Sequence, residues 1–206
     1  MCKIHYIMMI IGLLTGLFFM PVFDRACAFD FTDISAIGAA YMTHLSLHEI
    51  GHQVVAEKVG ADSPKMSFFI KKDGRLYPGL STYKDIPKES KLPYAAGGDR
   101  MAGFTFKYAL ESYHRYPTTY NKALMFFSCV DFFVYTLLAN YVRPENDMYD
   151  PNLIREETGI SKGVLLSLIT AKTLINTYRV FNESATVTPM IMVDRKSASL
   201  IFCFRF

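Results

Sequence analysis

The sequence predicts a mainly α fold with small β hairpins, an α+β class in which one motif-bearing helix packs with two to three further helices. Long apolar segments at 34–59 and 119–142 are typical of helices, and Pro- or Gly-containing breaks separate them from their neighbours. Two pairs of strand-like segments, 65–70 with 76–83 and 186–193 with 197–206, each surround a short polar turn. The chain has 206 residues and 51% hydrophobic residues, which suits a single domain with one substantial core.

The first 28 residues have the features of a signal peptide. Lys3 and His5 form a short basic start, an apolar run follows at 6–22, and Ala26-Cys27-Ala28 matches a small-x-small cleavage site. An uncleaved anchor is the alternative, because a run of about 17 apolar residues lies at the lower limit for crossing a bilayer. We therefore expect residues 29–206 to form one domain that is periplasmic or secreted, with membrane association as the alternative.

The helix predicted at 34–59 contains His48-Glu49-Ile50-Gly51-His52, the pattern H-E-x-x-H. On a helix, His48 and His52 lie one turn apart on the same face, where both can bind one Zn²⁺ at about 2.0–2.1 Å. The metal lowers the pKa of a bound water, and Glu49 can take its proton as a general base. His44 lies one turn earlier, and we interpret it as a polar neighbour of the site rather than as a ligand.

Two elements after the motif bear on the site. A hairpin around Asp73-Gly74 supplies an edge strand that either holds a peptide substrate by strand addition or only covers the core. The second helix, predicted at 94–113, is rich in small residues that let the motif helix approach closely. These small residues are Ala95, Ala96, Gly97, Gly98, Ala102 and Gly103.

A third metal ligand is expected from an acidic residue later in the chain. Asp131 lies alone in the apolar run 123–138 of the third helix, where a carboxylate must be paired, protonated or bound to a metal. Asp131 is therefore the first candidate, and a structural pair with Arg, Lys or Tyr is the alternative. Glu145, Asp147 and Asp150 are the rival ligands, in a polar loop expected to be solvated and to cap a fourth helix near 152.

The remaining chain predicts an amphipathic helix at 162–181, capped by Ser161, and then a terminal hairpin packed on the helices. Cys129 and Cys203 would remain after cleavage and are too few for a disulfide framework. Cys129 lies in an apolar run, which favours a buried free thiol, and a bridge to Cys203 is the alternative.

Over residues 34–142 the chain resembles the site-2-protease class of zinc metallopeptidases. In that class an H-E-x-x-H helix precedes a small strand region, a helix rich in small residues and a third helix with an Asp ligand. The matching positions are His48, Glu49 and His52, then Gly97-Gly98, then Asp131. The usual Asp-Gly dipeptide at the third ligand is absent, because Phe132 follows Asp131. Members span the membrane several times, whereas the second helix here is too charged, so the resemblance implies a periplasmic or membrane-peripheral relative.

The sequence thus predicts a zinc-dependent metallopeptidase that acts on a peptide or protein substrate. The alternative is a non-catalytic zinc-binding protein of the cell envelope. A net charge of +3, without a basic run, argues against a nucleic-acid partner. No pattern indicates an oligomeric state.

Overall fold

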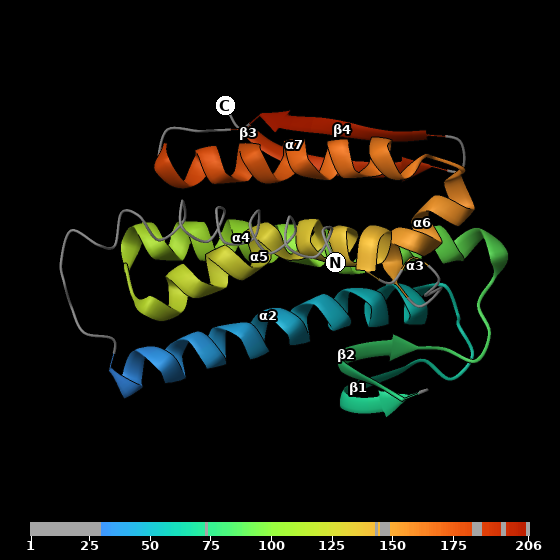
Figure 1. Cartoon of the computed structure of the whole chain (residues 1–206), viewed down its shortest axis with the longest axis horizontal. Coiled ribbons are helices and arrows are strands. Elements are labelled where there is room, and N and C mark those ends of the chain that lie inside the picture. The colour runs from blue at the N-terminus through green and yellow to red at the C-terminus, as the bar shows by residue number, and fades with distance from the viewer. Residues whose placement is uncertain are drawn as a thin grey trace.

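The computed structural model describes residues 30–72, 74–142, 144, 149–182, 187–194 and 197–204, so the predicted signal peptide lies outside the described residues. The elements, in chain order, are α2 (Phe31–Lys58), β1 (Lys65–Lys72), β2 (Arg75–Thr82), α3 (Lys91–Ala95), α4 (Gly97–Arg115), α5 (Thr119–Leu137), α6 (Asp150–Thr158), α7 (Lys162–Phe181), β3 (Val187–Asp194) and β4 (Ser197–Phe204). Figure 1 shows them in layers, with α4 and α5 between α2 and α7. The mainly α class with two small antiparallel hairpins is confirmed.

The motif helix α2 begins at Phe31, three residues before the predicted start. Its N-cap is Asp30. The carboxylate of Asp30 accepts a hydrogen bond of 2.8 Å from the backbone N–H of Asp33, and Asp33 lies in the first turn, where its charge favours the helix N-terminus. The helix packs against α4 and α5, as the fold prediction required.

The predicted second helix is two helices, α3 and α4, which meet at Ala96. The expected close approach is confirmed where α4 crosses α2. A Cβ atom added at Gly97 would lie 2.6 Å from the backbone oxygen of Gly51, so neither position accommodates a side chain without moving a backbone. The small residues therefore fix how deeply α4 lies against the motif helix.

Helix α5 and the π-helical turn Leu138–Val142 form the central helical stretch. Among the described residues, Thr119–Val142 is the one helical stretch long and apolar enough to cross a membrane. Of its most apolar 18 residues, 67% are buried inside the fold. One core cluster packs α5 against α2 and α4, around Phe106 and Leu124. A second packs it against α6, α7 and β3, around Leu165 and Ile169.

The C-terminal third covers the other side of α4 and α5 (Figure 1). The Ser161 side chain accepts a hydrogen bond of 3.3 Å from the Val164 N–H, which confirms the predicted cap of α7. Lys172 of α7 donates to Asp99 of α4 at 2.5 Å, and both side chains are buried. The β3–β4 hairpin packs on α7, as expected, and contributes Ile191 to the core.

The two described cysteines are free, Cys129 buried and Cys203 exposed. Burial raises the pKa of the Cys129 thiol to about 12. The expectation of a buried free thiol is confirmed.

Candidate metal centre

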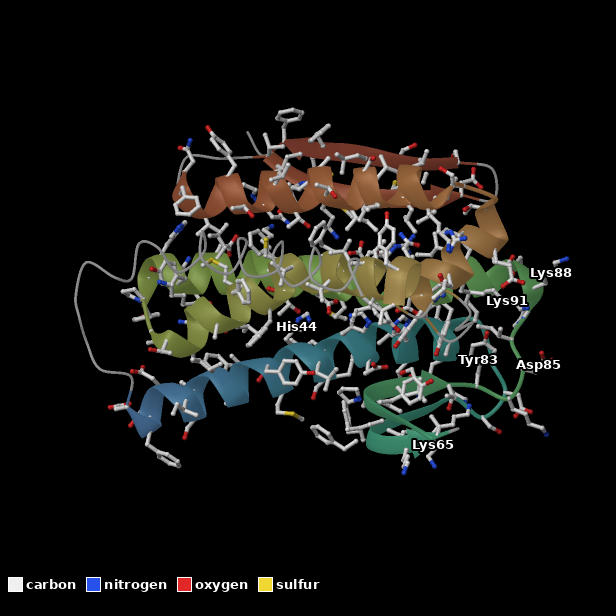
Figure 2. All side chains as sticks on the ribbon, in the orientation of Figure 1. His44, Lys65, Tyr83, Asp85, Lys88 and Lys91 are labelled. Atoms are coloured by element: carbon white, nitrogen blue, oxygen red, sulfur yellow. The ribbon has the colours of Figure 1, made fainter. Side chains whose placement is uncertain are left out.

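Three buried histidines follow one another at intervals of one turn on α2: His44, His48 and His52. Figure 2 shows His44 between α2 and the layer formed by α4 and α5. The four-residue spacing places all three rings on the buried stripe of the helix. The spacing in the sequence therefore predicts that the three rings share one face, whereas the tertiary packing determines which atoms each ring nitrogen contacts.

The ring atoms Nε2 of His48 and Nε2 of His52 lie 3.2 Å apart. The carboxylate atom Oδ2 of Asp150 lies 3.1 Å from Nε2 of His52 and 3.5 Å from Nε2 of His48. A tetrahedral zinc ion with bonds of about 2.0–2.1 Å holds its ligand atoms about 3.3–3.4 Å apart. The three atoms therefore have the mutual spacing of three corners of such a site.

The other ring nitrogens determine which atoms bear hydrogen. Nδ1 of His52 lies 2.8 Å from the backbone oxygen of Tyr94, which can only accept, so this nitrogen is the donor. Nδ1 of His48 lies 2.7 Å from Oδ2 of Asp131, and an ionised carboxylate likewise only accepts. Both Nε2 atoms then direct lone pairs toward each other and toward Asp150. This convergence of electron-rich atoms favours a bound cation.

A proton can take the place of the cation. Burial lowers the pKa of His48, but the carboxylates of Asp131 and Asp150 outweigh burial and raise it above its ordinary value. Burial raises the pKa of Asp150, yet His52 and His48 outweigh it, and this pKa lies below its ordinary value. The metal-free cluster therefore favours charged imidazole beside charged carboxylate.

Asp131 lies on the opposite side of His48 from His52. Its Oδ1 atom is 3.2 Å from Nε2 of His44, and its Oδ2 atom contacts Nδ1 of His48. Asp131 forms a possible metal-binding group with His44 and His48, whereas His52 groups with His48 and Asp150. The structure thus does not bring Asp131 to the side where the two motif histidines meet. Burial raises the pKa of Asp131, but His48 and His44 outweigh it and hold that pKa well below its ordinary value.

The expectation that Asp150 lies in a solvated loop is wrong. Asp150 is the first residue of α6, and only 7% of it is exposed. The helix begins two residues earlier than predicted because Pro151, whose ring favours the first helical turn, follows Asp150 directly. The rival candidates Glu145 and Asp147 lie outside the described residues.

Glu49 is also buried, and it lies against strand β2. A Cβ atom added at Gly79 would lie 2.7 Å from Oε1 of Glu49, so glycine is what lets the strand pass over this carboxylate. The hydroxyl of Ser81 donates to the backbone oxygen of Glu49 at 3.2 Å and fixes the strand to the helix. Burial raises the pKa of Glu49 above its ordinary value, because it outweighs His48 and His52, which lower this pKa.

Two cavities meet at Glu49. A polar cavity of about 240 Å³ is lined by His48, Glu49, His52 and Asp150 together with later β2 residues, Ser81 and Thr82 among them. An apolar groove of about 550 Å³ runs between α2, α5 and the start of β2. The residues common to both linings are His48, Glu49, Tyr77, Gly79 and Tyr135.

Sequence reasoning missed Tyr135 at this centre, and it missed one part of the role of Gly98. Tyr135 lies one helical turn after Asp131, and that spacing alone places it on the same face of α5. Gly98 lies beside the two Nε2 atoms, because an added Cβ atom would overlap Nε2 of His48 and lie 2.6 Å from Nε2 of His52. Gly98 was expected to let the motif helix approach closely. It also leaves room for the imidazole rings of His48 and His52.

Comparison of the chain with protein-family models, with curated proteins and with solved structures finds no match.

Proposed function

We propose that this chain is a zinc-dependent metallopeptidase whose metal is held by His48, His52 and Asp150. The observation that supports it is the convergence of two imidazole Nε2 atoms and one carboxylate oxygen within 3.1–3.5 Å of one another. Three protein ligands of this kind are typical of catalytic zinc, whereas structural zinc sites use four. Asp131 and the Tyr94 carbonyl then orient the two imidazoles through their Nδ1–H groups.

Two histidines and a carboxylate also suit Fe(II). The neighbouring Glu49 favours hydrolysis, because its buried carboxylate lies next to the ligand cluster and lines both cavities. When bound, zinc supplies Lewis acidity and lowers the pKa of water at the site. Glu49 is placed to accept a proton from the attacking water and to deliver it to the leaving amine.

Tyr135 is the proposed donor to the oxygen that becomes negative in the transition state. It lines both cavities, and its ring centroid lies 6.2 Å from that of His48. Burial, with the nearby charges of Asp150 and Glu49, raises the pKa of its hydroxyl well above the ordinary value. The hydroxyl therefore stays protonated at neutral pH and can donate a hydrogen bond.

The test compares metal content with hydrolysis in the purified full-length chain. We expect about one zinc per chain by elemental analysis, casein hydrolysis that a chelator abolishes, and restoration by added zinc. Glu49→Gln should keep the zinc and lose hydrolysis, because the amide cannot accept the proton. Glu57→Gln is the matched control, since Glu57 is an exposed glutamate on the same helix.

Two results would contradict the proposal. Retained turnover in Glu49→Gln would remove the general base. A zinc-loaded wild-type chain without hydrolysis would instead support the non-catalytic zinc-binding alternative.

A further inference from the structure

The apolar groove lies directly beside the proposed catalytic base. The groove has a volume of about 550 Å³. Its apolar lining includes Leu45 on α2, Val130, Val134 and Leu138 on the α5 side, and Leu76 on β2. This volume lies within the range of about 300–1,000 Å³ that ligand pockets occupy. Leu76 is 62% exposed, so an apolar side chain stands open to solvent at the groove.

Asp131, one of the two carboxylates that line the groove, already has histidine partners. Asp131 lines the groove, but its two oxygens lie 3.2 Å and 2.7 Å from ring nitrogens of His44 and His48. An apolar side chain that enters therefore displaces water without leaving the Asp131 carboxylate unpaired. Most of the remaining lining residues are aliphatic or aromatic, and such surface binds apolar groups.

Strand β2 gives the groove a direction relative to a bound peptide. Its first residues, Leu76 and Pro78, line the groove, and its last residues, Ser81 and Thr82, line the polar cavity. Gly79, between them, lies against Glu49. Antiparallel strand pairs are more stable and more common than parallel ones. A peptide added antiparallel to β2 thus begins beside the polar cavity, passes Glu49, and ends along the groove.

We propose that the groove is the subsite for a large apolar side chain, such as leucine, methionine or phenylalanine, immediately C-terminal to the scissile bond. This inference rests on the proposed peptidase function and specifies its substrates as extended peptides. The polar cavity, which also includes Lys72, Ser81 and Thr82, receives the residues before the scissile bond.

The first test is cleavage-site analysis of a mixed peptide library by the zinc-loaded full-length chain. We expect leucine, methionine and phenylalanine to be enriched directly after the cleaved bond. Enrichment before that bond, or no enrichment, would overturn the inference and leave the peptidase proposal standing.

The second test changes the groove at an exposed position. Leu76→Asp should lower kcat/KM for a leucine-containing peptide by about tenfold or more, because an apolar subsite discriminates by about 10–200-fold. Leu174→Asp is the matched control, since Leu174 is 57% exposed on α7 and lies outside the groove lining. Equal loss in both variants, or none in Leu76→Asp, would contradict the assignment.

A binding measurement separates the groove from catalysis. Calorimetry on zinc-loaded Glu49→Gln would compare two succinyl hydroxamates that differ only in an isobutyl or a carboxymethyl side chain. We expect the isobutyl compound to bind about tenfold more tightly, and Leu76→Asp to abolish the difference. This result would support the groove even if the chain hydrolyses nothing, whereas equal affinities would overturn it even if the chain is a peptidase.

Discussion

Asp131 approaches His48 through Nδ1, at 2.7 Å, the ring nitrogen opposite the one that faces His52. A carboxylate in this position fixes the tautomer and orientation of a ligating imidazole without touching the metal. Asp150 lies on the Nε2 side of the same ring, at 3.5 Å. The two acids therefore contact different ring nitrogens of His48. For this reason Asp150 is the proposed metal ligand and Asp131 is the proposed orienting carboxylate.

The ligand assignment predicts unequal effects of two conservative substitutions. Asp150→Asn removes a charged ligand and should lower zinc affinity by more than about 100-fold, whereas Asp131→Asn should lower it by about 10–100-fold, as expected for an orienting carboxylate. Competition with a chromophoric chelator measures both. Asp62→Asn is the control, because Asp62 is exposed.

The sequence alone favoured the reverse order, with Asp131 as the ligand and Asp150 nearly silent. Zinc loss in Asp131→Asn with zinc retention in Asp150→Asn would restore that interpretation. The possible group formed by His44, His48 and Asp131 would then be the metal site.

A second prediction concerns the glycine that faces the imidazoles. Gly98→Ala should abolish stoichiometric zinc binding, because the added methyl group occupies space taken by the Nε2 atoms of His48 and His52. Gly103→Ala is matched by residue type and helix, and its added methyl group meets no atom within 4 Å. Elemental analysis of both variants, with circular dichroism to check the helices, gives the result. Full zinc content in Gly98→Ala would show that the two rings do not bind where the structure places them.

Local patterns predicted much of the fold because the residues that determine each element are neighbours in sequence. Ser161 caps α7, Gly74 lies between two paired strands, and the H-E-x-x-H segment is helical. The start of α2 was placed late because Asp30, Thr32 and Asp33 are all capable caps. Only the folded backbone shows which one accepts a hydrogen bond.

The site was predictable only where its residues share one helix. Asp150 is far along the chain from His48. It stands before a proline in a hydrophilic segment, which is typical of a helix start, so the local sequence does not single it out as a site residue. For Asp131, the apolar run left pairing, protonation and metal binding open, and the structure pairs it with His44 and His48 rather than with Arg, Lys or Tyr. Pairing with histidine and binding to zinc both offset the cost of burial, so burial alone could not choose between them.

The third prediction tests Tyr135 as a transition-state donor. Tyr135→Phe should lower kcat by about 10²–10³-fold, the effect of removing one preorganised donor, with little change in zinc content. Tyr108→Phe on α4 is the control, because Tyr108 is 67% exposed. An unchanged kcat in Tyr135→Phe, or a parallel loss of zinc, would contradict a donor role.

The last prediction concerns the buried pair of Lys172 and Asp99, which joins α7 to α4 immediately after Gly98. The two charged atoms lie 2.5 Å apart, and the residues are 8% and 6% exposed. Removing one partner leaves an uncompensated buried charge, so Lys172→Met should cost about 3–5 kcal/mol in the free energy of unfolding. The double variant Lys172→Met with Asp99→Leu should recover most of that loss, because apolar side chains of similar size replace a buried pair with little penalty.

The exposed pair of Lys84 and Asp62, at 3.5 Å, is the reference. Lys84→Met should change stability by no more than about 1 kcal/mol, because solvent already screens this pair. Urea unfolding of Lys172→Met, Asp99→Leu, the double variant and the wild type gives the coupling energy of the buried pair, and Lys84→Met is measured in the same way. If the double variant loses as much as the sum of its single variants, Lys172 and Asp99 do not act together, and other contacts hold α7 to α4.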